Sequence, residues 1–354
     1  MSVVVVGNGL IGLSAAIALE QHGANVTLIG ERRVGEASPA GAGMLGPSVE
    51  HAHGAAFDFA IAARDRYPAF IEWIARTTGV HVALDRSGVI ELAHTAADVA
   101  RLRAQVGDDA RWLDPAELHD LEPGLSPTLG ALLRESDGWV DSGTLVSAMR
   151  DYASRAPGIT HVSDPAVALS RGFRGIAVAC ASGRQHDASC VILANGAWAG
   201  EMRGLPRPLP VEPVRGQMIS VAAPLGHVVV GGGGYAIPRR TGETFIGATM
   251  ERVGFDNSIT VDALEMLQGV ARNLGPQLGA AEVTRQWAGL RPITPDLQPI
   301  IGRDPSLPEL IYACGHSRNG ILMAPLTGDV VASLALGEEP WFDLAPFSVL
   351  RFAR

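Results

Sequence analysis

The hydrophobic pattern at the start of the chain predicts a strand, a helix and a second strand. Ser2 to Val6 is a short apolar run without alternation, which is typical of a parallel strand buried on both faces. Leu10 to His22 carries apolar residues at helical spacing, and Gly23 stands where a helix C-cap belongs. Asn25 to Ile29 is another short apolar run. The sequence therefore predicts one complete β-α-β unit.

Later segments of the chain show the hydrophobic periodicities of both helices and strands. Asp58 to Glu72 has apolar residues at roughly helical spacing, which predicts an amphipathic helix. Val191 to Leu193 predicts a buried strand, and Gly234 to Thr249 alternates like antiparallel strands. A further helix is expected to begin near Ile321. These patterns predict an α/β protein with strands of more than one kind.

The turn after the first strand carries a glycine pattern that indicates a dinucleotide site. Gly7, Gly9 and Gly12 form G-x-G-x-x-G between the predicted strand and helix. Gly7 permits the tight turn, Gly9 lets the backbone approach a pyrophosphate, and Gly12 allows close helix packing. The phosphates are expected at the N-terminus of the helix.

The residue expected to bind the ribose departs from this pattern. An acidic residue usually ends the second strand of such a unit. Here Gly30 stands at that position, and Glu31 comes one residue later. Glu31 either reaches the ribose hydroxyls or is a solvated charge at the start of a loop, and the sequence leaves both interpretations open.

The segment from residue 37 to residue 45 favours FAD over NAD, which the glycine turn alone cannot separate. It consists almost entirely of small residues and ends in Met44-Leu45. Such a loop suits a backbone that passes close to a flat ring system. The alternative is a flexible surface linker, for which the segment is too apolar.

Composition excludes several other classes of protein. All 28 basic residues are arginine, so pyridoxal phosphate enzymes and P-loop NTPases, which need a lysine, are excluded. The net charge of −9 and the scattered arginines give no support for binding nucleic acid or anionic membranes. The three cysteines have neither a metal-ligand nor a disulfide spacing, so we expect no metal. Without a signal-peptide layout or a long apolar stretch, we expect a cytoplasmic protein.

Several separated segments carry a family resemblance over nearly the whole chain. Together they resemble the FAD-dependent glycine oxidase and D-amino-acid oxidase family. The most specific are Trp287 to Pro292 and Gly315 to Leu322. The others are the loop at 37–45, the predicted helix at 58–72 and the segments at 121–123, 137–144, 191–198 and 213–218.

This resemblance implies a discontinuous fold with two domains. Residues 1–80, 140–205 and 290–354 would form an FAD-binding, Rossmann-like domain of the glutathione-reductase type. Residues 81–139 and 206–289 would form a substrate domain with a mixed or antiparallel sheet.

The resemblance also implies the residues of the substrate site. Arg291 matches the arginine that clamps the substrate carboxylate, and its planar guanidinium suits a bidentate pair. Arg318 matches a second arginine near substrate and flavin. Tyr235 matches a tyrosine that hydrogen-bonds the carboxylate, and Met250 matches an apolar wall near the amine. A structural ion pair, a strand aromatic and a core methionine are the alternatives for these types of residue.

The expected FAD contacts come from six separated parts of the chain. The turn from Gly315 to Gly320 precedes a helix, so its free N–H groups can stabilise negative charge on the flavin. His316 is expected to act through its backbone, and we identify no general base. The predicted cofactor residues are Gly7, Gly9, Leu10, Ile11, Gly12, Gly30, Glu31, Ala37, Ser38, Ala42, Gly43, Met44, Ala166, Gly196, His316, Ser317, Arg318, Asn319, Gly320, Ile321 and Leu322.

The implied reaction is oxidation of glycine or an N-substituted glycine by O2, through an imine, with release of H2O2. A second possibility is an oxidase that cleaves an N-carboxymethyl group from a bulkier amino acid, because Gly233 stands where we align a histidine of a glycine oxidase. A non-catalytic FAD-binding module and an NAD dehydrogenase also stay open at this point. The substrate and O2 are the expected partners, and a homo-oligomer is left open.

Overall fold

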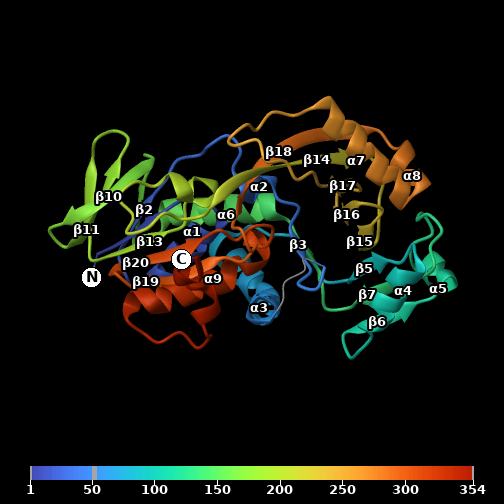
Figure 1. Ribbon diagram of the computed structural model, residues 1–354, viewed down its shortest axis with the longest axis horizontal. Coiled ribbons are helices and arrows are strands. Elements are labelled where there is room, and N and C mark those ends of the chain that lie inside the picture. The colour runs from blue at the N-terminus through green and yellow to red at the C-terminus, as the bar shows by residue number, and fades with distance from the viewer. Residues whose placement is uncertain (1, 50–53, 353–354) are drawn as a thin grey trace.

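A six-stranded sheet forms the centre of one half of the molecule (Figure 1). The computed structural model describes residues 2–49 and 54–352. The order of the strands is β19-β20-β13-β1-β2-β9, and all neighbours are parallel except the pair of β19 with β20. The bounds are β1 (Val3–Val6), β2 (Val26–Ile29), β9 (Ile159–Val162), β13 (Cys190–Leu193), β19 (Ile300–Asp304) and β20 (Leu307–Cys314).

Both faces of this sheet are covered, which explains why the first strand is apolar without alternation. Val3 and Val5 pack in the core formed with the helices, whereas Val4 and Val6 pack in a second core on the opposite face. The helices are α1 (Leu10–Gln21), α3 (Ala55–Thr78), α6 (Ser142–Arg155) and α9 (Gly320–Leu336). The opposite face is covered by a small antiparallel sheet of β10 (Ala166–Gly172), β11 (Gly175–Cys180) and β12 (Gln185–Ala188).

Helices α1 and α9 pack closely although they come from distant parts of the sequence. A Cβ atom added at Gly328 of α9 would lie 2.6 Å from the backbone carbon of Ser14 of α1. Only a glycine therefore lets these two helix backbones approach as they do. This contact brings the N-terminal ends of both helices to the same side of the sheet, where each borders the cavity described below.

The second half is built on an eight-stranded sheet of order β18-β14-β17-β16-β15-β5-β7-β6. All neighbours are antiparallel except β15 with β5. One face packs on α7 (Val261–Leu274) and α8 (Pro276–Ala280). The strands are β5 (Val89–Leu92), β6 (Ala110–Leu113), β7 (Ala131–Arg134), β14 (Glu212–Val221), β15 (Val228–Gly231), β16 (Gly234–Pro238), β17 (Thr244–Gly247) and β18 (Val283–Ile293).

Smaller elements connect the two halves. The sheet β3-β8-β4 joins residues from three separated segments. Its strands are β3 (Met44–Leu45), β4 (Leu84–Asp85) and β8 (Gly138–Val140), and the remaining elements are α2 (Ala37–Ala40), α4 (Ala96–Arg103), α5 (Pro115–Leu121), η1 (Gly196–Glu201), η2 (Ala345–Phe347) and η3 (Val349–Phe352).

The structure confirms the α/β fold class with parallel and antiparallel sheets. The predicted β-α-β unit is present, and each of its boundaries agrees with the prediction to within one residue. The predicted helix at 58–72 is longer, as α3, and continues through Pro68. The loop predicted at 37–45 is wrong in part, because it contains α2 and β3. The division into two domains stays a prediction, and β18 runs past its boundary at residue 290 to Ile293.

Across the described ranges, 2–49 and 54–352, the chain forms no helix of sufficient length and apolar character to cross a membrane.

Candidate active site

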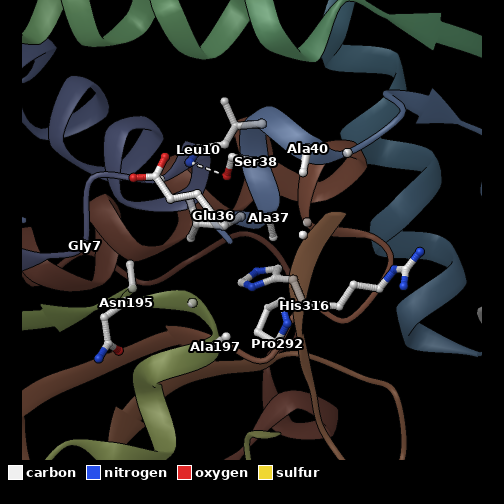
Figure 2. Close-up of a pocket in the computed structure, with 18 of the residues that line it drawn as sticks. Gly7, Leu10, Glu36, Ala37, Ser38, Ala40, Asn195, Ala197, Pro292 and His316 are labelled. Atoms are coloured by element: carbon white, nitrogen blue, oxygen red, sulfur yellow. Dashed lines mark hydrogen bonds between the residues drawn. The ribbon is translucent and has the colours of Figure 1, made fainter. Parts of the chain in front are cut away.

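A cavity lies between the first half of the molecule and the eight-stranded sheet, and Figure 2 shows some of the residues that line it. Its walls come from the glycine turn after β1, from α2 and the loop to β3, and from the segments after β13 and β20. The eight-stranded sheet contributes Gly216, Met218, Tyr235, Gly289 and Arg291. The cavity therefore runs from the predicted dinucleotide turn to the predicted substrate residues.

At the end of the cavity formed by the turn after β1, glycine residues leave the backbone uncovered by side chains. Gly7 has a φ of 111°, and a Cβ atom there would lie 2.3 Å from the carbonyl oxygen of Ala194. A Cβ atom at Gly12 would lie 1.8 Å from the carbonyl oxygen of Gly7. Helix α1 has no side-chain cap at Gly9, and the Leu10 N–H donates to the Ser38 hydroxyl (2.9 Å) (Figure 2). A pyrophosphate fits this turn, because the helix N-terminus attracts its negative charge.

The small-residue segment after α2 is fixed from outside through four consecutive carbonyl groups. Ala40 accepts from the Trp287 indole N–H (2.9 Å), and Gly41 accepts from the Ser142 hydroxyl (2.6 Å). Ala42 accepts from the Arg239 guanidinium (2.5 Å), and Gly43 accepts from the Val140 N–H (2.8 Å). The segment is thereby held as a fixed wall on which a flat ring can lie.

The N-terminus of α9 closes the wall beside this segment. A Cβ atom at Gly41 would lie 2.5 Å from Cδ1 of Ile321, so the two walls touch here. Asn319, the residue before α9, makes no side-chain cap, and Ser317 adopts a φ of 52°. Taken with the glycine turn, this cradle of backbone and small side chains fits FAD.

The substrate end is defined by two side chains on one face of the sheet. Arg291 on β18 lies flat over Gly216, where an added Cβ atom would be 1.9 Å from its Nη1. Tyr235 on β16 lies over Gly247 in the same way, with 2.5 Å from an added Cβ atom to its ring, and its hydroxyl lies 3.9 Å from the Met218 sulfur. Two glycines on neighbouring strands thus make room for the arginine and the tyrosine.

Arg291 has the contacts expected of a group that binds a ligand. Its Nη1 donates to the carbonyl oxygen of Thr249 (2.9 Å). Within the part of the chain that the structure describes, Arg291 forms no ion pair, which disfavours the alternative of a structural salt bridge. A guanidinium has five N–H donors, so it retains capacity for a carboxylate. Arg318 lines the same cavity.

Met250 is not brought to the cavity. Its side chain is 53% exposed, and it is not among the residues that line the cavity walls. The cause is the alternation of side chains along the extended segment after β17, because the neighbouring Thr249 hydroxyl accepts from the Gln217 N–H (2.8 Å) and Glu251 pairs with Arg215. Thr249 and Glu251 thus turn toward the protein and Met250 turns outward, so we do not assign Met250 to the site.

Most of the predicted cofactor residues line the cavity, and three do not. Gly12 packs against the Gly7 carbonyl, Asn319 precedes α9, and Leu322 is buried in the helix core. Those that line it are Gly7, Gly9, Leu10, Ile11, Gly30, Glu31, Ala37, Ser38, Ala42, Gly43, Met44, Ala166, Gly196, His316, Ser317, Arg318, Gly320 and Ile321.

Sequence reasoning missed several residues of the cavity. Gly289 and Pro292 flank Arg291 within a motif already identified, so that motif was a usable signal. Asn8 lies inside the glycine pattern at a position that the pattern leaves open. Trp198 ends the segment at 191–198, which already carried the family resemblance. Glu36 had no signal, because only the folded chain brings it to the cavity.

His316 lies in the cavity wall as a neutral side chain. It is buried, with Nε2 3.2 Å from the Thr327 hydroxyl, and Figure 2 shows its ring beside Pro292. Burial lowers the pKa of His316 to about 3. An imidazole that stays neutral at physiological pH holds no proton to donate as a cation, which agrees with a structural role.

This burial predicts a pH dependence of stability. As pH falls below about 6.5, the unfolded chain protonates His316 whereas the folded chain does not until about pH 3. The free energy of unfolding should therefore fall by up to about 1.4 kcal/mol per pH unit from this residue. The free energy of unfolding is measured by urea titration at saturating FAD between pH 6 and pH 4. Its decrease with falling pH should be smaller in His316→Gln than in the parent, by the equivalent of up to one bound proton. The exposed His161→Gln is the control, and equal slopes for His316→Gln and the parent would contradict the prediction.

These features define an FAD dependent oxidoreductase. Residues 2–334 match the DAO family of FAD dependent oxidoreductases, and the chain belongs to this family.

Relatives extend the likeness over the whole chain. A glycine oxidase from Geobacillus kaustophilus is 33% identical, with 99% of this chain and 96% of the relative covered. A crystal structure of glycine oxidase from Geobacillus kaustophilus matches with a TM-score of 0.93, covering 99% of each chain. That of iminodiacetate oxidase from Chelativorans sp. BNC1 matches with a TM-score of 0.89 at 26% identity, covering 98% of each chain. The bifunctional protein ThiO/ThiG from Synechocystis is 33% identical, and the chain spans 54% of its length.

Proposed function

We propose that this protein oxidises glycine or an N-substituted glycine at its α-carbon, giving an imine and H2O2. The observation that carries the proposal is Arg291, which lies flat on Gly216 at the end of a cavity that fits FAD. The relatives named glycine oxidase support the same substrate class.

In this proposal the chain's residues bind and orient the substrate. The Arg291 guanidinium pairs with the carboxylate, and the Tyr235 hydroxyl donates to the same group. Met218 and Pro292 line the cavity with apolar surface that excludes water around the α-carbon. Bound FAD supplies the acceptor for the α-hydrogen and two electrons, which it passes to O2.

The same residues explain why the site needs no side-chain base. Burial lowers the pKa of His316 to about 3, which makes it too weak a base to take a proton from the substrate amine, and its Nε2 lies 3.2 Å from the Thr327 hydroxyl. The substrate amine binds as the neutral form after losing a proton to water. Fixing the carboxylate then restricts the orientation of the α-carbon relative to the bound cofactor.

An oxidase that cleaves the N-carboxymethyl group of a bulkier amino acid remains the second candidate, because the structurally similar iminodiacetate oxidase is named for a compound that carries such a group. Gly233 does not carry this alternative. It lies in the turn between β15 and β16 with a φ of 91°, and it is not among the residues that line the cavity. Replacement of Gly233 by histidine would strain the backbone, so it is a poor test of pocket size.

The test is peroxide formation by the purified protein with glycine, sarcosine, D-alanine and iminodiacetate. Turnover of glycine or sarcosine above the other compounds supports a glycine oxidase. Preference for iminodiacetate supports the second candidate. A protein that retains FAD and forms no peroxide with any of these would contradict the proposal in favour of a non-catalytic module.

Cofactor attachment gives a separate prediction. Cys314 ends β20 and lines the cavity, yet it is 1% exposed and burial raises the pKa of its thiol to about 12. A buried thiol at neutral pH is a poor nucleophile, since the thiolate is the reactive form. We expect non-covalent FAD, so acid precipitation should leave all yellow colour in the supernatant. Flavin absorbance in the washed pellet would show that the attachment is covalent.

A further inference from the structure

The end of the second strand lacks the acidic side chain that a dinucleotide fold uses for the ribose. Gly30 follows β2 directly, and its surroundings are already filled. A Cβ atom added there would lie 3.0 Å from the Asn8 nitrogen and 3.2 Å from Asn8 Cγ. The Asn8 side chain donates to the Gly30 carbonyl (3.1 Å). The usual position is therefore crowded by Asn8.

Two other acidic side chains line the cavity near this point, and they differ in how firmly they are held. Glu31 has a side chain 40% exposed, and its closest cationic atom is Arg33 Nε at 3.8 Å. Glu36 has a side chain only 12% exposed. Its Oε1 accepts from the Arg33 N–H (2.8 Å) and its Oε2 accepts from Arg150 Nη2 (2.7 Å). Glu36 is thus fixed in place before any ligand binds.

Arg150 connects Glu36 to the glycine turn. Its guanidinium also donates to the Asn8 carbonyl, with Nη2 and Nε at 3.2 Å and 3.3 Å. Its charge offsets the carboxylate, so Glu36 can lie close to a pyrophosphate without an uncompensated repulsion. A carboxylate offers about four acceptor sites, and these contacts use two of them. Figure 2 shows the Glu36 side chain extending past Leu10, at the helix end that we assign to the phosphates.

We propose that Glu36, held by Arg150, accepts the hydrogen bonds of the adenosine ribose hydroxyls of FAD in place of a strand-end acid. Glu31 is then a solvated charge at the start of the loop. This inference concerns the cofactor alone and does not depend on the identity of the substrate.

The test compares FAD with an FAD analogue whose adenosine ribose lacks both hydroxyl groups. Dissociation constants are measured by flavin fluorescence on protein stripped of cofactor and shown to rebind FAD. The parent should bind the analogue about 10- to 100-fold more weakly, because hydrogen bonds to a charged group are lost. Glu36→Gln should weaken FAD binding, and Glu36→Ala should bind FAD and the analogue within about threefold of each other. Glu31→Gln is the matched control and should retain both affinity and discrimination.

If the ion pair of Glu36 with Arg150 only stabilises the fold, the binding experiment gives a different result. Glu36→Ala would then lower the melting temperature without FAD while keeping the full preference for FAD over the analogue, which would overturn the proposal. Loss of discrimination in Glu31→Gln would also overturn it. If only Glu36→Ala fails to fold, Glu36→Gln carries the test: a preference for FAD over the analogue equal to that of the parent decides against the proposal, and a smaller preference decides for it. Equal binding of FAD and analogue by the parent also decides against the proposal. Peroxide formation from glycine at saturating FAD is recorded in parallel, and failure there concerns only the proposed substrate.

Discussion

Arg291→Lys is expected to lower kcat/KM for a carboxylate substrate by about 30- to 1,000-fold, with FAD content unchanged. The planar guanidinium lies against Gly216, and a lysine ammonium cannot reproduce its bidentate pair with a carboxylate. The loss corresponds to about 2–4 kcal/mol of transition-state stabilisation. Initial rates of peroxide formation across substrate concentrations give the ratio.

The chain offers a matched control on the same strand. Arg285 also lies on β18, but its guanidinium stacks over the Trp287 ring at 4.1 Å and is exposed. Arg285→Lys should change kcat/KM by less than about threefold, since it removes only a surface stacking contact. If both lysine variants behave alike, or if Arg291→Lys keeps the parent's ratio, Arg291 does not bind the substrate.

Gly12→Ala is expected to yield protein without FAD. The new Cβ atom would lie 1.8 Å from the Gly7 carbonyl oxygen, and both partners belong to the backbone of one tight turn. Relief of that overlap must displace α1 from β1, and the phosphate-binding turn is then lost. Absorbance near 450 nm relative to 280 nm should fall to near zero in the purified variant.

Gly269→Ala serves as the comparison, because it makes the same chemical change within α7. An added Cβ atom there meets only the end of the Arg272 side chain at 3.8 Å, and alanine is the better helix former. This variant should keep a full complement of FAD. A Gly12→Ala protein that purifies yellow would show that the turn tolerates a larger helix separation than the structure indicates.

Local signals made the N-terminal unit predictable. Val3 to Val6, the three glycines and α1 carry local patterns that predict their structure, so pattern and turn chemistry were sufficient even though distant segments pack against them. The segment from Ala37 to Leu45 was less predictable. Its carbonyl groups are held by Trp287, Ser142 and Arg239, and no local pattern reports partners so far along the chain.

The residues of the substrate site also differ in how well the sequence predicted them. Arg291 follows from a specific motif, and the structure places it in the cavity wall as expected. Met250 was assigned by alignment with the family, but its direction depends on how Thr249 and Glu251 pair with β14. One residue of strand register reverses a side chain, and sequence similarity alone does not fix that register. Glu36 was not predicted, because its place in the cavity depends on Arg150 in a distant helix.

The close packing of α1 on α9 sets an order of events during synthesis. Strand β1 emerges from the ribosome early, but its neighbour β13 and the helix α9 are encoded far downstream. At about 5–20 residues per second, Cys190, which pairs with Val3, follows roughly 10 to 40 s later. Until then, the nascent β1 and α1 have β2 beside them but lack β13 and α9. FAD therefore cannot be enclosed before α9 begins to be made, since the cavity lacks its second wall until Ile321 is present.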